Sequence, residues 1–195
     1  VGEDGATHQA LEDIAIMRAL PKMKVVVPCD VVEIEKATIA AANTKGPVYI
    51  RSGRDKFPVI TTKRTSFKIG KANILRKGKD VTIIACGLMV YEALIAAEIL
   101  AEKGISTMVV NNHTIKPIDK RTIVGCAKKT KAIVTAEEHQ LSGGLGSAVS
   151  EVVSRHYPVP IKMVAVMDKF GQSGKSKELL NKYGLTHKHI VEAAV

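Results

Sequence analysis

The sequence has few of the residues that nucleic-acid or disulfide chemistry would need. Tryptophan is absent and aromatic residues make up 4% of the chain, so platforms on which bases could stack are scarce. The three cysteines, Cys29, Cys86 and Cys126, are far apart and form no CxxC pair, which argues against a disulfide framework or a zinc site. Reduced thiols are typical of cytoplasmic proteins, and we expect a cytoplasmic location.

Long apolar runs are also missing. No stretch approaches the roughly 20 residues that a membrane-spanning helix requires, so no membrane association is expected. Acidic residues are outnumbered 19 to 29, which gives a net charge of +10. Residues 61–80 carry seven basic residues and one acidic residue, whereas residues 1–60 carry eight of each. We interpret the basic stretch as a solvent-facing linker or partner contact, and we do not expect nucleic acid as a partner.

The periodicity of the residues that are present predicts an α/β fold. Short β-branched runs alternate with helical segments, which is typical of sheets built from parallel strands. Strands are expected at residues 24–28, 47–53, 81–87, 107–111, 132–138 and 161–167. Helices are expected at residues 9–19, 30–42, 90–103, 119–129 and 145–156, with two short helices after residue 174.

These elements divide the chain into three parts. Residues 1–60 hold two strands and two helices, which are too few for the sheet of such a fold, so we predict a partial domain. Residues 61–80 form the basic linker. Residues 81–195 are predicted to be a complete doubly wound domain with a mostly parallel sheet. The expected architecture has three layers, with helices on both faces of the sheet.

The first candidate site is the polar loop GEDGATHQ, residues 2–9. Gly2 and Gly5 permit a tight turn close to a ligand. Asp4 offers a carboxylate to substrate hydroxyls, and His8 could carry a proton near neutral pH. Spacing alone leaves open a helix-capping turn in which both side chains are only structural.

The second candidate site is the pair of arginines in PVYIRSGRDKFP. Arg51 and Arg54 follow a strand, and ligands bind at the carboxyl ends of strands in open α/β sheets. Arginine also suits bidentate recognition of phosphate. The alternative is a pair of surface salt bridges.

Glycine-rich segments near the end of the chain are weaker candidates. SGGLGS at residues 142–147 lacks the complete GxGxxG spacing and the Walker lysine, so we interpret it as a strand-to-helix turn that needs close packing. Glu137, Glu138 and His139 precede it. Adjacent residues at a strand end point in different directions, which favours a solvated loop or an interface over a metal cluster. FGQSGK at residues 170–175 is expected to be a loop.

Together these motifs resemble those of transketolases and their thiamine-diphosphate relatives. GEDGATHQALEDIAIMRALP is similar to the GEDGPTHQ block of that family, VVVPCDVVE to the step that follows it, and DKFGQSG with KYGLT to its C-terminal block. Deoxyxylulose-phosphate synthases share the first block but lack KFGQSG. The β subunits of 2-oxo-acid dehydrogenases usually carry a different His-Ser-rich loop. Transketolase fits best, particularly the form split into N- and C-terminal subunits.

The resemblance implies roles for four residues. Asp4 would contact sugar hydroxyls, and His8 would line the same channel and assist proton transfer. Arg54, in register with the arginine of the family's SRQNLP motif, would bind the sugar phosphate. Arg51 belongs to a YIRxGR variant and is a further substrate-binding candidate. Residues 1–60 would be the C-terminal half of a pyrimidine-binding domain, and the domain after the linker would be the family's C-terminal domain.

The resemblance also implies thiamine diphosphate and Mg²⁺ in the complete enzyme, not bound by this chain alone. The family's activating glutamate and pyrimidine-holding aromatics lie upstream of GEDG, and its GDG…Asn metal motif has no counterpart here. Val1 is therefore expected to be a truncation point.

We expect an N-terminal section or subunit as partner, and a homodimer. The complete enzyme would transfer a two-carbon ketol unit between sugar phosphates of the pentose phosphate pathway, and the isolated chain would be inactive. The alternative is a non-catalytic assembly module in which residues 70–195 mediate dimer contacts.

Overall fold

The computed structural model describes residues 3–195, so Gly2 of the predicted turn lies outside the described residues. The helices are α1 (Asp13–Ala19), α2 (Val31–Ala42), α3 (Met89–Glu102), α4 (Lys120–Thr130), α5 (Leu145–His156), α6 (Ser176–Lys182) and α7 (His187–Ala194). The strands are β1 (Lys24–Val26), β2 (Val48–Ile50), β3 (Asn73–Arg76), β4 (Val81–Ala85), β5 (Thr107–Asn111), β6 (Thr114–Lys116), β7 (Ile133–Gln140) and β8 (Ile161–Val166). Each predicted element has a counterpart, whereas β3 and β6 were not predicted.

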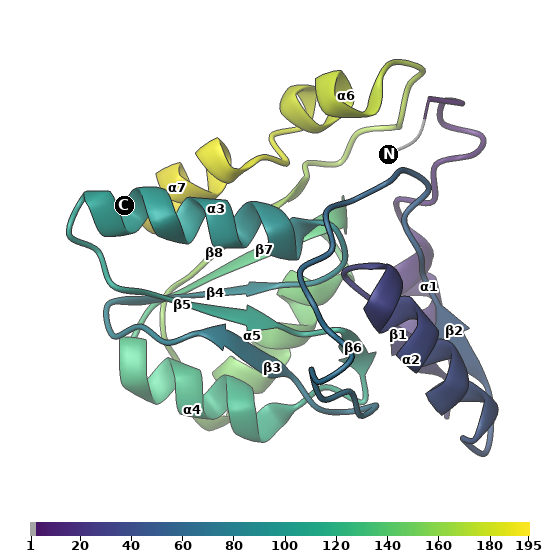
Figure 1. Ribbon diagram of the computed structural model, residues 1–195, viewed down its shortest axis with the longest axis horizontal. Coiled ribbons are helices and arrows are strands. Elements are labelled where there is room, and N and C mark those ends of the chain that lie inside the picture. The colour runs from purple at the N-terminus through teal and green to yellow at the C-terminus, as the bar shows by residue number, and fades with distance from the viewer. Residues whose placement is uncertain (1–2) are drawn as a thin grey trace.

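The larger sheet has five strands in the order β3-β5-β4-β7-β8. Strands β5, β4, β7 and β8 are parallel, and β3 runs antiparallel to β5 at one edge. Helices α3 and α7 cover one face of this sheet and α4 and α5 cover the other (Figure 1). The predicted three-layer α/β fold with a mostly parallel sheet is therefore confirmed. Among residues 3–195, no helix is long and apolar enough to cross a membrane.

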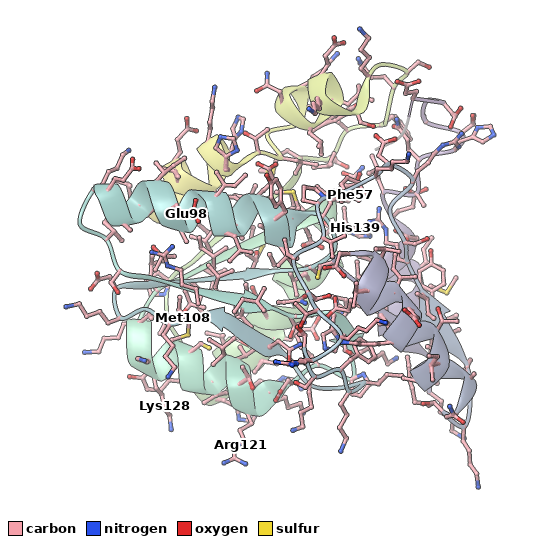
Figure 2. The ribbon with its side chains drawn as sticks, in the orientation of Figure 1. Phe57, Glu98, Met108, Arg121, Lys128 and His139 are labelled. Atoms are coloured by element: carbon pink, nitrogen blue, oxygen red, sulfur yellow. The ribbon has the colours of Figure 1, made fainter. Side chains whose placement is uncertain are left out.

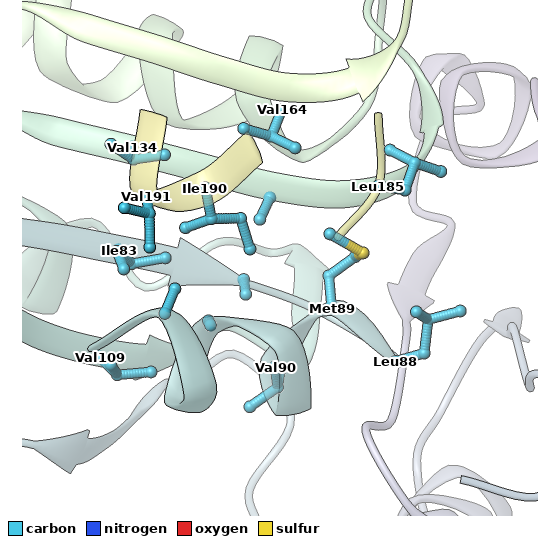
Figure 3. Close-up of a cluster of buried hydrophobic side chains, with 14 of the residues drawn as sticks. Ile83, Leu88, Met89, Val90, Val109, Val134, Val164, Leu185, Ile190 and Val191 are labelled. Carbon is cyan, nitrogen blue, oxygen red and sulfur yellow. The ribbon is translucent and has the colours of Figure 1, made fainter. Parts of the chain in front are cut away.

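The core of this sheet explains why its strands read as continuous apolar runs in the sequence. All five positions of β4 are buried, because helices cover both faces of a parallel sheet and leave no face for water. Figure 3 shows Ile83, Val109 and Val134 of the sheet facing Met89 of α3 and Ile190 of α7. This packing holds the strands of the larger sheet in place, and the candidate site lies beside the carboxyl end of β7.

Asp30 caps α2, and it also holds the segment that follows β2. Its carboxylate accepts hydrogen bonds from the backbone amides of Glu33 (2.9 Å), Ile60 (2.8 Å) and Thr61 (2.5 Å). Burial by itself would raise the pKa of Asp30, but hydrogen bonds from Thr61 and Glu33 outweigh it and lower the pKa. The segment after β2 is thereby held against the start of α2.

A smaller sheet, in the order β2-β1-β6, joins the two parts of the chain. Strands β1 and β2 are parallel neighbours, and β6 pairs antiparallel with β1. Because β6 comes from residues 114–116, the part of the chain after the predicted linker completes the sheet of the first part. The two strands counted in the sequence are thus extended by a third from beyond the linker.

The structure differs from the predicted linker at residues 73–76, which form β3. Asn73 pairs with Asn111 and Ile74 with Val110 at the edge of the larger sheet. Edge strands tolerate charge and exposure because one side of the strand lacks a neighbour, so this strand looked like part of a basic connector.

Further basic residues lie on α4, where Arg121 and Lys128 point away from the sheet (Figure 2).

Candidate functional site

A polar hollow of about 260 Å³ lies where the loop before α1 meets the end of β2. It brings together three of the four residues that the sequence nominated, because His8, Arg51 and Arg54 all line it. The complete lining consists of residues 8–11, Asp13, residues 49–54 and Glu138.

The loop that carries Asp4 and His8 forms the predicted tight turn. The backbone amides of His8 and Gln9 donate to the carbonyl oxygen of Gly5 at 3.0 and 3.1 Å. Gly5 has a φ of 85°, a left-handed conformation that glycine adopts without steric cost. The side chain of His8 is exposed and contacts Thr7 Oγ1 through Nδ1 at 2.9 Å. Helix α1 begins at Asp13, four residues later than predicted, so the polar loop is longer than expected.

Asp4 and Arg54 form an ion pair at the edge of the hollow. Their side chains are 36% and 66% exposed, and an ion pair in water contributes only about 0–1 kcal/mol. An anionic ligand could therefore take the place of the Asp4 carboxylate on the guanidinium of Arg54 at little cost.

Arg51 has a different environment from Arg54, because its side chain is only 13% exposed. Its Nε lies 3.1 Å from Asp13 Oδ2, its Nη1 3.3 Å from Glu138 Oε2, and its Nη2 donates to the carbonyl of Ala10 at 2.8 Å. Tyr49 also donates to Asp13 (2.6 Å), and burial together with this carboxylate raises the pKa of Tyr49 to about 12. The two ion pairs of Arg51 are largely shielded from solvent, unlike the exposed pair of Arg54 with Asp4, which matches the surface salt bridge offered as the alternative. The ion pairs of Arg51 join the end of β2 to α1 and β7.

The solvated loop expected at residues 137–139 was wrong, because all three residues are buried, whereas the interface offered beside it stays a prediction. Glu137, Glu138 and His139 are 1%, 6% and 0% exposed. The Glu137 carboxylate accepts the backbone amides of Leu145 (2.5 Å) and Gly146 (2.8 Å) at the start of α5. Burial raises the pKa of Glu137 to about 7, although these two hydrogen bonds act in the opposite direction.

His139 connects the larger sheet to α1. Its Nε2 accepts the backbone amide of Ala15 at 3.3 Å, and its Nδ1 lies 2.7 Å from the carbonyl of Gln140. A ring that accepts on one nitrogen and donates on the other is neutral, and burial lowers its pKa. Figure 2 shows His139 where the larger sheet meets the N-terminal part of the chain.

The glycine-rich turn after β7 was the sequence signal that could have revealed the buried carboxylate of Glu137. A Cβ on Gly144 would lie 2.0 Å from Glu137 Oε2, and one on Gly143 would lie 2.4 Å from Ala15 Cβ. Arg18 of α1 donates to the carbonyl of Gly143 at 2.7 Å. The predicted need for close packing in this turn is therefore confirmed.

Among residues 3–195, no group of three or more histidine, cysteine, aspartate or glutamate side chains is placed to hold a metal ion. Of the carboxylates that line the hollow, Asp13 and Glu138 are both ion-paired with Arg51. Both lining carboxylates thus already have a cation as partner, and the exposed guanidinium of Arg54 is the group of the hollow best placed to meet an anion.

Comparison with known proteins identifies the two parts of the chain. Residues 1–59 match the family model "Transketolase, pyrimidine binding domain", and residues 70–190 match "Transketolase, C-terminal domain". The chain is 46% identical over 191 residues to the 6-deoxy-6-sulfo-D-fructose transketolase subunit of Clostridium sp. (strain MSTE9), covering 98% of this chain and 59% of that protein. It is 47% identical to a putative transketolase C-terminal section of Methanocaldococcus jannaschii, covering 98% and 61%.

Solved structures agree with these matches. A structure titled "Split gene transketolase, inactive beta4 tetramer" is 47% identical and superposes with a TM-score of 0.93, covering 97% of this chain and 62% of that one. Transketolase from Campylobacter jejuni, at 24% identity and a TM-score of 0.77, shares the fold over 98% of this chain and 29% of its own. The chain thus spans about 60% of the length of the first relatives. It belongs to the transketolase family and comprises the family's C-terminal domain preceded by part of its pyrimidine-binding domain.

Proposed function

We propose that this chain is the C-terminal section of a split transketolase that transfers a two-carbon ketol unit from a ketose phosphate to an aldose phosphate. The observation that carries the proposal is that His8 and Arg54 line the same hollow and that Asp4 is paired with Arg54. Its relatives named as a subunit or a section of a transketolase support the split arrangement. The complete enzyme would act in the cytoplasm, in the pentose phosphate pathway.

In this proposal each side chain has a separate task. Arg54 binds the phosphate, because its guanidinium is 66% exposed and its planar donors suit bidentate contact with phosphate oxygens. Asp4 accepts hydrogen bonds from sugar hydroxyls after it leaves Arg54, and His8 moves a proton at the sugar. Arg51 shapes the hollow by holding Asp13 and two neighbouring segments, and it does not contact the phosphate directly.

The cofactor would be held elsewhere in the complete enzyme. Thiamine diphosphate with Mg²⁺ would supply the carbon nucleophile that accepts and releases the two-carbon unit. The carboxylates of the hollow are already paired with Arg51. We therefore assign cofactor binding to an N-terminal section, and we propose that a homodimer brings the sections together. This chain would position the phosphorylated sugar.

A sulfonated sugar is a second candidate substrate, because one relative is named a 6-deoxy-6-sulfo-D-fructose transketolase subunit. A sulfonate presents three oxygens to Arg54 as a phosphate does, but it carries a single negative charge. Comparing kcat/KM for donors that differ only in phosphate or sulfonate distinguishes the two substrates.

The test is the variant Arg54→Ala in the chain reconstituted with a transketolase N-terminal section. We expect kcat/KM for phosphorylated acceptors to fall by about a hundredfold, the loss of one charge-assisted contact of about 3 kcal/mol, with a much smaller fall for unphosphorylated acceptors. Arg64→Ala, an exposed arginine that does not line the hollow, is the matched control. Equal losses on both classes of acceptor would contradict the phosphate role. Unchanged turnover in Asp4→Ala and His8→Ala would favour the assembly-module alternative.

A further inference from the structure

The loop that carries Asp4 and His8 is held by a segment from the other end of the sequence. Asp4 forms an isolated antiparallel β-bridge with Ser173. Five residues later, Gln9 Nε2 donates to the carbonyl oxygen of Gln172 at 2.9 Å. Figure 1 shows the segment before α6 passing beside the N-terminal loop. We call residues 170–173 the clasp.

The clasp and the loop approach so closely that a Cβ on either of two glycines would meet a side chain of the other segment. A Cβ on Gly5 would lie 2.8 Å from Ser173 Oγ, and a Cβ on Gly171 would lie 1.9 Å from Gln9 Oε1 and 3.4 Å from Ala6 Cα. Gly171 does not have a positive φ, so its backbone would accept any residue. A larger residue at position 171 would therefore have to displace the Gln9 side chain, which is itself buried and bonded to Gln172.

Helix α6 and Tyr183, the residue that follows its last turn, hold the clasp in place. Tyr183, which is 8% exposed, donates from its hydroxyl to the carbonyl of Phe170 at 3.0 Å. Lys182 Nζ donates to Gln172 Oε1 at 2.6 Å. Leu179 of α6 is 2% exposed and belongs to the core formed on the α3 and α7 side of the larger sheet. The position of the loop thus depends on the packing of the C-terminal domain.

We propose that Gln9 and Gly171 are positioning residues: through them the C-terminal domain sets the orientation of Asp4 and His8 toward the substrate. This inference rests on the proposed function, because it concerns the same hollow. A ligand group must meet its partners within a fraction of an ångström for full effect. The hydrogen bond of Gln9 and the contact at Gly171 would supply that restraint to an otherwise exposed loop.

Amide hydrogen exchange in the full chain tests the restraint without any need for activity. Gly171→Ala forces the clasp away from Gln9, and Gln9→Leu removes the amide donor. In each variant we expect the amides of His8 and Gln9 to exchange about tenfold faster or more, while those of β4, which report global unfolding, keep their rates. Gly125→Ala is the matched control, because a Cβ there meets nothing within 4 Å. Unchanged exchange at His8 and Gln9 in both variants would overturn the proposal.

A double-mutant cycle in the reconstituted enzyme separates positioning from a general structural role. Gly171→Ala alone should lower kcat/KM by about tenfold, and it should add little to the loss already caused by His8→Ala, because both changes act through one loop. Additive losses would refute the positioning role. The wild-type complex could transfer no ketol unit while the variants still speed amide exchange at His8 and Gln9. That result would refute the proposed function but would support the restraint of the loop by the clasp.

Discussion

Glu137 provides the sharpest test of the electrostatics of this fold. Its carboxylate lies at the start of α5, where two backbone amides and the helix dipole favour the ionised form. Burial favours the neutral form and dominates, so the pKa of Glu137 rises from 4.5 to about 7. The variant Glu137→Gln keeps a carbonyl acceptor and a neutral charge at every pH, and therefore mimics the protonated side chain.

The expected magnitude follows from the shift in pKa. Between about pH 4.5 and pH 7 the folded protein keeps a proton on Glu137 that the unfolded chain has released, so the free energy of unfolding falls as pH rises. At about 1.4 kcal/mol per pH unit, the shift corresponds to a loss on the order of 3 kcal/mol across this range. The glutamine variant does not titrate and should not show this loss.

The assay is urea unfolding of both proteins at about pH 5 and about pH 8, followed by circular dichroism. Burial lowers the pKa of His113 and of His139, and each destabilises the fold on acidification. The effect of His113 is common to both proteins and cancels in the difference. His139 Nδ1 lies 3.9 Å from Glu137 Oε2, so His139→Gln is added to both proteins to remove its titration from the comparison. We expect the variant to gain about 3 kcal/mol relative to wild type between the two pH values. A difference that is constant with pH would refute the reasoning, and a change of opposite sign would mean that the backbone donors dominate.

Three further predictions concern packing and charge, and all are measured as free energies of unfolding. Gly144→Ala should cost at least about 1–3 kcal/mol, because its Cβ would lie 2.0 Å from Glu137 Oε2; an unchanged midpoint would contradict the close packing of this turn. Arg51→Met should cost about 3–5 kcal/mol, because it leaves the buried Asp13 and its neighbours without their cation; a cost below about 1 kcal/mol would show that these carboxylates find other partners. Ile83→Ala should cost about 2–5 kcal/mol, because the side chain is completely buried in the core of the larger sheet, and a smaller loss would indicate that the core collapses around the cavity.

Much of the fold could be predicted because it is encoded locally. Apolar strands such as β4, the aspartate that caps α2 and the turn at Gly5 each depend on residues close together in the chain. Strands β3 and β6 were missed because each is short and lies at the edge of a sheet, with residues that also suit a loop. Their pairing partners are 33 or more residues away, from Arg76 to Val109 at the nearest, and no local pattern marks them.

The candidate site likewise has features that the sequence predicted and features that only the tertiary structure shows. The sequence by itself determined the family and the α/β class, because motif spacing and apolar periodicity are local properties of the chain. It also predicted four site residues, Asp4, His8, Arg51 and Arg54, whose roles stay a proposal. Only the tertiary structure decided that Arg51 is engaged in buried ion pairs, that Glu137 is desolvated beneath α5, and that residues 170–173 hold the first loop. The physical reason is that burial and pairing depend on which distant segments meet, and the spacing of residues along one chain does not record it.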